Sequence, residues 1–231
     1  FAKKSKMKLG LVTYQWGKDW DLPTLIANCE KTGLLGVELR TEHAHGVETS
    51  LSASQRAEVK KRFADSPVKC LGYGSNFDYH HADQARVRKN IEGTKQYLQL
   101  CKDIGSTGIK VKPNGFPDGV SKEKTIAQIA ASFNECGKFA ADLGLVVRVE
   151  VHGEGTQELP NMKAIFEQVT EESVKMCWNC NDQDPYQQLM NLFNGIKYDG
   201  WILLEARTEP ADRVAAMKEQ LQLFNKMVGN V

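Results

Sequence analysis

The strongest constraint on the fold is an alternation of short β-prone runs with longer segments of helical period. The strand-like runs cover residues 8–14, 36–40, 68–73, 108–112, 145–152, 174–179 and 200–205. The helical segments follow them at 21–31, 52–64, 83–104, 121–143, 159–170, 185–196 and 210–228. This alternation is typical of βαβ units, whose strands are parallel. The sequence therefore predicts an α/β fold of seven strand–helix units, one fewer than a (β/α)8 TIM barrel holds.

Composition narrows the classes of protein. The 231 residues carry 30 Lys and Arg against 29 Asp and Glu, and 41% are hydrophobic, which predicts one sizeable domain over residues 1–231. A net charge of +1 without a long basic run argues against nucleic acid as a partner. No apolar stretch reaches the roughly 18 residues of a membrane-spanning helix, so we expect no membrane partner.

Cellular location and assembly stay open at this stage. A cytoplasmic location is favoured, and an exported form stays open because the chain begins at Phe1. The sequence also leaves open whether the chain forms a homo-oligomer. The six cysteines are expected to be buried thiols. Cys177 and Cys180 have redox spacing but follow a strand, which argues against a redox pair.

Ionisable residues recur at every second position of several predicted strands. Residues two apart share one face of a strand, and a face covered by helices cannot hold charges cheaply. We therefore expect these side chains to point into a barrel lumen. Those latest in each strand would lie nearest the carboxyl ends of the strands, where barrel active sites form: Arg40, Lys112, Glu150, His152, Asn179, Glu205 and Arg207.

Two of these strands carry a resemblance to a known family. The run Val147–His152 (VRVEVH) resembles the strand of xylose-isomerase-like sugar isomerase and epimerase barrels that bears a metal-binding Glu. Tyr198–Glu205 (YDGWILLE) is similar to the final strand of that family and its second Glu, and Gly33–Glu38 (GLLGVE) to an early strand. The family includes sugar phosphate isomerases and epimerases, hydroxypyruvate isomerase, ketose 3-epimerases and keto-inositol dehydratases.

The resemblance implies a site and a chemistry. Glu150 and Glu205 would be catalytic acid–base groups and, with Asn179, would bind one divalent metal ion: Mg²⁺, Mn²⁺, Co²⁺ or Zn²⁺. The ion would hold a carbonyl oxygen of a sugar or polyol substrate, and a carboxylate would move the proton of the neighbouring carbon. His152 would support the site or contact a substrate hydroxyl, and Arg207 would hold the metal site or the substrate. The alternative for Glu150 is a structural ion pair with Arg148 or with Lys110 of the neighbouring strand, and the alternative for Glu205 is one with Arg207.

Further candidates lie at the predicted carboxyl ends of strands. Lys112 would bind a substrate oxygen or stabilise an enolate, and its alternative is a lysine that reaches solvent. His43, His45, His80 and His81 follow two strands and are candidate substrate contacts or additional metal ligands, with exposed loop histidines as the alternative. Trp16 is a candidate apolar wall against a sugar, with Trp20 beside it, and packing is the alternative.

The sequence departs from the family pattern at two places. Asn179 stands where the family usually has Asp, which should weaken a metal site. The family also places a His ligand on its seventh strand, and between Asn179 and the last strand there is room for one loop and one helix only. We therefore expect that one βα unit, about 35 residues, is missing near Asp184–Tyr186, with a natural seven-unit barrel as the alternative.

Four functions compete on this reasoning. A sugar isomerase or epimerase that works through an enediolate comes first. The second hypothesis, a keto-sugar or keto-inositol lyase or dehydratase, shares the first step of this reaction. The third is a carbohydrate-binding barrel without catalysis, which is open because Asn179 replaces the usual metal-binding Asp. An endonuclease on damaged DNA shares the barrel, but five histidines and a near-neutral chain argue against its three-metal cluster.

Overall fold

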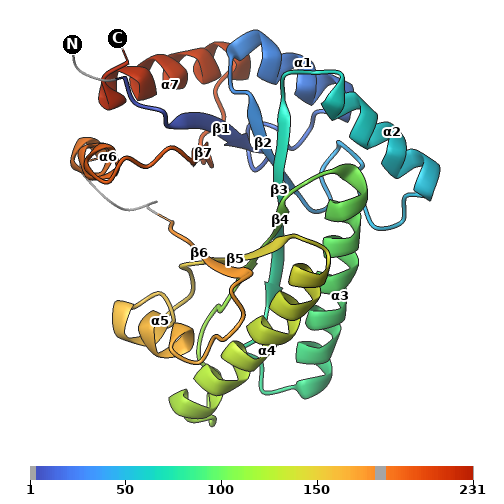
Figure 1. The fold of residues 1–231 in the computed structure, drawn as a ribbon, viewed down its shortest axis with the longest axis vertical. Helices are drawn as coiled ribbons and strands as arrows, with labels where there is room; N and C mark the ends of the chain where they lie inside the picture. The colour runs from blue at the N-terminus through green and yellow to red at the C-terminus, as the bar shows by residue number, and fades with distance from the viewer. Residues whose placement is uncertain (1–3, 180–185, 231) are drawn as a thin grey trace. The chain divides into compact units, whose positions relative to one another are not determined.

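The computed structural model describes residues 4–179 and 186–230, and helices alternate with strands throughout them (Figure 1). The chain divides into two compact units. The first unit comprises residues 1–47, 58–71 and 180–231, and the second comprises residues 48–57 and 72–179. Helix α2 (Ala53–Ala64) and strand β3 (Lys69–Asp78) each have residues in both units.

The first unit is built on three parallel strands. Strand β1 (Lys8–Val12) pairs with β2 (Gly36–Arg40) on one side and with β7 (Trp201–Leu204) on the other. Its helices are α1 (Leu22–Thr32), α6 (Tyr186–Gly195) and α7 (Arg213–Val228), and α7 contacts both of the others. Asp21 caps α1 by accepting a hydrogen bond from the backbone of Thr24, and Gly33 ends the helix in a left-handed conformation.

The second unit continues the pattern. Strand β3 pairs with β4 (Gly108–Lys112), β4 with β5 (Val146–Glu150), and β5 with β6 (Val174–Cys177), all in parallel. The helices α3 (Gln84–Ile104) and α4 (Lys122–Asp142) pack on β4 and β5 and on each other, and the short α5 (Leu159–Phe166) packs on α4 (Figure 1). Val147 and Val149 of β5 are completely buried.

The strands follow the hydrogen-bonded order β6-β5-β4-β3-β2-β1-β7. The prediction of an α/β fold with seven parallel strands is therefore confirmed. The two edge strands in this order, β6 and β7, are consecutive in the sequence. The βα unit expected near Asp184–Tyr186 would fall between them, but residues 180–185 lie outside the described residues.

Strands β1, β5 and β6 each end two residues before the predicted boundary, and β3 and α5 differ more from the prediction. Strand β3 extends to Asp78, five residues beyond the predicted end, because a register shift between Gly74 and Asp78 lets poor β-formers stay in the strand. The hydroxyl of Ser75 also donates a hydrogen bond to the carbonyl of Lys110 at 2.7 Å. Helix α5 ends at Phe166 rather than at residue 170, just before a stretch that contains β-branched Val169 and Thr170.

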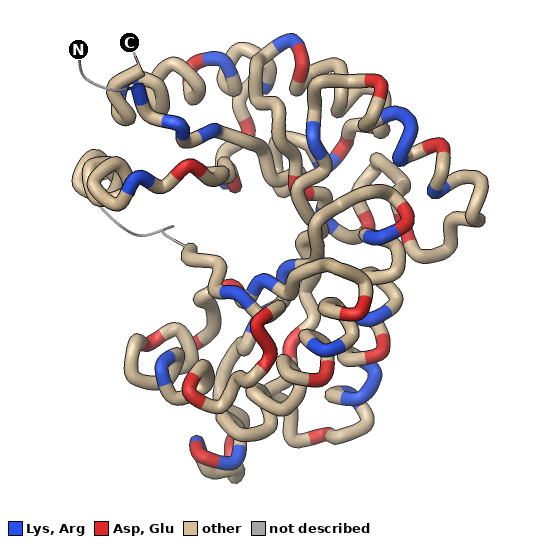
Figure 2. Tube along the Cα trace, in the orientation of Figure 1, with Lys and Arg blue, Asp and Glu red and all other residues tan. Residues whose placement is uncertain are grey.

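Most of the described cysteines are buried thiols, as the sequence predicts. Cys29, Cys70, Cys101 and Cys136 are buried, Cys177 is partly buried, and none of the five is in a disulfide; Cys180 lies outside the described residues. Basic and acidic residues are interspersed along the helices of each unit (Figure 2). In the described part of the chain, no helix is both long and apolar enough to span a membrane.

A missing unit has a direct chemical signature. Trypsin cleaves after Lys175 and Lys197, and no Lys or Arg lies between them. If a βα unit is missing, digestion of the natural protein should give no peptide Met176–Lys197, and peptide mass mapping should instead show longer or additional peptides joined to these ends. Recovery of the intact Met176–Lys197 peptide would establish a natural seven-unit chain.

Candidate active site

Glu150 is the last residue of β5, and its carboxylate is buried in the second unit. The residue is only 3% exposed, and its Oε1 accepts a hydrogen bond from the Asn179 amide nitrogen at 2.7 Å. The other oxygen, Oε2, lies 3.4 Å from the Nζ atom of Lys110 on the neighbouring strand β4. Among the described residues, Oε2 has no hydrogen-bond partner. The parallel register of β4 and β5 thus brings a carboxylate and an ammonium group together inside the protein.

The surroundings of Glu150 determine its charge. Burial by itself would raise the pKa of this carboxyl group, because an apolar environment disfavours the charged form. The positive charges of Lys110 and Lys112, the hydrogen bond from Asn179 and the nearby His152 outweigh burial and lower the pKa below its ordinary value. Glu150 is therefore a carboxylate at neutral pH, the state that a general base or a metal ligand requires.

Two further predicted residues lie in the same unit. The Nζ atom of Lys112 contacts the Asn76 side-chain oxygen at 3.5 Å. The Nδ1 atom of His152 lies 2.8 Å from the Oδ1 atom of Asn114, and because an amide oxygen only accepts, the histidine donates there. The structure thus groups Glu150, Lys112, Asn179 and His152 at the carboxyl ends of β4, β5 and β6.

Glu205 and Arg40 lie in the first unit. Glu205 directly follows β7, and its Oε1 lies 3.5 Å from the Nη1 atom of Arg40, the last residue of β2. The Arg40 guanidinium also lies over the Tyr14 ring, 5.4 Å from its centroid. Arg40 is buried and Glu205 is partly buried, so this ion pair is shielded from water.

The loop histidines after β2 differ in their surroundings. His45 is buried and accepts a hydrogen bond from the backbone of Val47 through Nδ1, so its Nε2 donates to the carbonyl of Arg40 at 2.8 Å. These contacts tie the loop together. His43 lies 3.1 Å from the Thr13 hydroxyl through Nδ1, and burial, followed by the nearby His45 and Arg40, lowers its pKa to about 4. His43 is therefore neutral at physiological pH.

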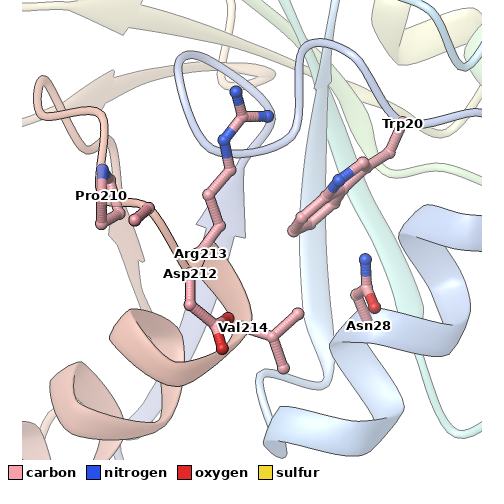
Figure 3. Close-up of a pocket in the computed structure, with 7 residues that line it drawn as sticks. Trp20, Asn28, Pro210, Asp212, Arg213 and Val214 are labelled. Carbon is pink, nitrogen blue, oxygen red and sulfur yellow. The ribbon is translucent and has the colours of Figure 1, made fainter.

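The two tryptophans after β1 differ in their surroundings, and only Trp20 lines a pocket of the first unit. Trp16 is buried, and its indole nitrogen donates a hydrogen bond to the carbonyl of Thr208 at 2.8 Å, so it anchors the segment after β7. Arg207, in that segment, is exposed. A pocket of about 510 Å³ lies between Trp20 and Asn28 on one side and residues 210–214 on the other (Figure 3). Neither Trp16 nor Arg207 lines it, and their predicted contacts with substrate stay predictions.

The sequence belongs to a recognised family. Residues 26–183 match the xylose isomerase-like TIM barrel family, which is more than half of the chain. The chain belongs to this family. Its TIM barrel fold, predicted from the sequence, is confirmed. No curated protein matches the sequence significantly.

Solved structures of the xylose isomerase-like fold resemble this chain along most of its length. L-ribulose 3-epimerase is 12% identical, with a TM-score of 0.81 over 97% of this chain and 95% of that one. The 3-keto-D-glucoside 4-epimerase YcjR from E. coli is 14% identical, with a TM-score of 0.77 over 95% and 99%. The IolI protein, solved with a bound zinc atom, is 17% identical, with a TM-score of 0.67 over 88% and 75%. At these identities the likeness establishes the fold.

The sequence offers Lys110 as one possible ion-pair partner of Glu150, and the structure shows this contact. It does not single out Asp78 or Asn114, although Asn114 donates to Asp78 at 2.8 Å and accepts from His152. No local signal indicates these contacts, because the three residues lie far apart in the chain.

Loss of one partner of the buried Lys110–Glu150 ion pair should strongly destabilise this xylose isomerase-like protein. Lys110→Met should lower the free energy of unfolding in urea by about 3 kcal/mol, because it leaves a buried carboxylate without its counter-charge. Lys175→Met, an exposed lysine on β6, should change it by less than about 0.5 kcal/mol. The double variant Lys110→Met with Glu150→Gln should recover part of the loss. Equal stability of the two single variants would show that the pair is not important for stability.

Proposed function

We propose that the protein is a sugar isomerase or epimerase that moves a proton at a carbon next to a carbonyl group. The observation that carries the proposal is the buried Glu150 carboxylate, which is ionised although only 3% of the residue is exposed. The similarity in fold to proteins named as sugar epimerases supports the substrate class. A buried carboxylate with neighbouring cations is suited to proton abstraction followed by stabilisation of the charge that develops.

Glu150 would act as the base. Its carboxylate takes the proton from the substrate carbon, and the C–H electron pair moves to form an enediolate whose negative charge resides on the former carbonyl oxygen. Return of a proton to the same carbon from the opposite face gives epimerisation, and return to the neighbouring carbon gives isomerisation. From the sequence resemblance we propose Glu205 as the second acid–base group of this reaction.

The neighbouring polar groups would hold the substrate and its charge. Lys112 carries an ammonium group whose field already lowers the pKa of Glu150, and the same charge would stabilise an enediolate oxygen. His152, oriented by Asn114, would meet a substrate hydroxyl through Nε2. Arg207, His43, His45 and Trp16 are proposed as substrate contacts from the first unit.

The donors around Glu150 suit a hard divalent cation. The Oε2 atom of Glu150 is buried and lacks a hydrogen bond among the described residues, and Asn179 brings an amide group to the same carboxylate. Carboxylate and amide oxygens suit Mg²⁺ or Mn²⁺, but here the Lys110 ammonium group lies beside Oε2 and Asn179 turns its nitrogen to Oε1. From the sequence resemblance alone we propose that Glu150, Asn179 and Glu205 hold one divalent ion, which when bound would polarise the carbonyl group of the substrate.

Proton exchange with solvent tests the reaction directly. With Mn²⁺ and keto-sugars in D2O, the protein should introduce deuterium next to the carbonyl group, and Glu150→Gln should slow this exchange by about 10²–10⁴-fold, the usual contribution of a general base. Mass spectrometry of the sugar measures the exchange. Glu172→Gln makes the same chemical change at an exposed glutamate and should leave the rate unchanged.

The outcomes separate the competing functions. Exchange accompanied by a new ketose or aldose supports isomerisation or epimerisation. Exchange accompanied by loss of water would replace the isomerase proposal with a dehydratase. Tight sugar binding without exchange in any sugar of the panel would establish a carbohydrate-binding barrel and overturn the proposed catalysis.

A further inference from the structure

A second group of potential metal ligands lies in the second unit, at the end of β3. Asp78, His80 and His81 bring three ligand atoms, one from each side chain, within 4.8 Å of one another. Asp78 is buried, and the two histidines are mostly buried, with side chains 17% and 13% exposed. The group is made of two imidazoles and one carboxylate, whereas the donors proposed around Glu150 are all oxygen atoms.

The backbone of this segment is held in place before any ion binds. Tyr79 between the ligands is completely buried, and its hydroxyl lies 2.6 Å from the hydroxyl of Thr94 on α3. The side-chain amide of Gln128 on α4 donates hydrogen bonds to the carbonyls of Tyr79 and His81, at 2.7 and 2.9 Å. The chain around the three side chains is therefore fixed by two helices.

The Asp78 carboxylate is held by side-chain amides. Asn90 donates to its Oδ1 at 3.0 Å, and Asn114 donates to its Oδ2 at 2.8 Å. Hydrogen bonds of this kind orient the carboxylate ligands of metal sites and fix their position. Oδ2 keeps a lone pair for a further partner, because a carboxylate oxygen accepts more than one hydrogen bond, whereas Oδ1 also accepts from His81.

The two imidazoles face this carboxylate. The Nε2 atom of His81 lies 2.5 Å from Asp78 Oδ1, and the Nδ1 atom of His80 lies 3.8 Å from Asp78 Oδ2. The His80 Nδ1 atom is buried and has no hydrogen-bond partner among the described residues. A buried nitrogen that lacks a partner and faces a carboxylate is suited to a cation.

We propose that Asp78, His80 and His81 bind a divalent transition-metal ion of the zinc class, at a site separate from Glu150. Two nitrogen donors and one oxygen favour Zn²⁺, Co²⁺ or Ni²⁺ over Mg²⁺. Metal–ligand bonds of about 2.0–2.1 Å place the ligand atoms of a tetrahedral site roughly 3.3 Å apart. The Nδ1 atom of His80 and the Oδ2 atom of Asp78 are slightly further apart, at 3.8 Å. Binding would replace the hydrogen bond between His81 and Asp78, and water would complete the coordination. Because Asn114 joins Asp78 to His152, the ion would also fix the position of His152.

Zinc titration of the whole chain tests this site. The Glu150→Gln variant, freed of metal, removes the principal ligand of the other proposed site and should still bind one Zn²⁺ by calorimetry. Adding His80→Phe and His81→Asn should weaken this binding by at least about 100-fold, since even the loss of an outer-shell partner costs 10–100-fold. Phe preserves the ring at position 80, and Asn can still donate to Asp78. Circular dichroism confirms that each variant is folded.

A control and a second probe sharpen the result. Glu172→Gln, which changes an exposed glutamate of the same unit, should leave zinc binding of the Glu150→Gln variant unchanged. Co²⁺ bound to the Glu150→Gln variant should give a visible absorption band that is lost with His80→Phe and His81→Asn. Absence of zinc binding in the Glu150→Gln variant, or unchanged affinity without the two histidines, overturns the site. Proton exchange is measured separately, so either result leaves the proposed function to its own test.

Discussion

The second unit is organised around a buried carboxylate whose charge is balanced by a neighbouring strand. Parallel pairing of β4 and β5 places Lys110 within 3.4 Å of Glu150, and Asn179 after β6 donates to the other oxygen. A carboxylate that is 3% exposed would be protonated or destabilising without these partners. The register of three strands therefore determines whether the carboxylate is ionised, and an ionised carboxylate is what the proposed chemistry requires.

Strand periodicity explains why the charges gather there. On β5, Val147 and Val149 are completely buried, while Glu150 occupies the alternate face. Covering helices α3 and α4 pack on β4 and β5. Burial of the apolar residues thus stabilises the scaffold, and the alternate positions carry the chemistry. In the first unit the same rule places Arg40 at the end of β2, where it meets Glu205 after β7.

Much of this was predictable from the sequence, because the relevant signals are local. The alternation of elements predicted seven parallel strands, and the two-residue period predicted that Glu150 would point into the protein. Contacts that depend on side chains far apart in sequence were not predictable. Nothing local indicates that Asn114 joins Asp78 to His152, or that Trp16 is buried against Thr208. The predicted end of β3 is too early, because Gly74, Ser75 and Asn76 are poor strand formers. In the structure these residues stay in the strand, where the pairing with β4 shifts register between Gly74 and Asp78.

The central claim is that the cations and the amide around Glu150 outweigh the effect of burial and keep it ionised. Carbon-13 NMR of side-chain carboxyl groups in the metal-free protein measures this directly, with the Glu150 signal assigned by its absence in Glu150→Gln. We predict a pKa below the ordinary value of 4.5 for Glu150. A pKa above 4.5 would show that desolvation dominates, and would contradict the account of this carboxylate as a ready base.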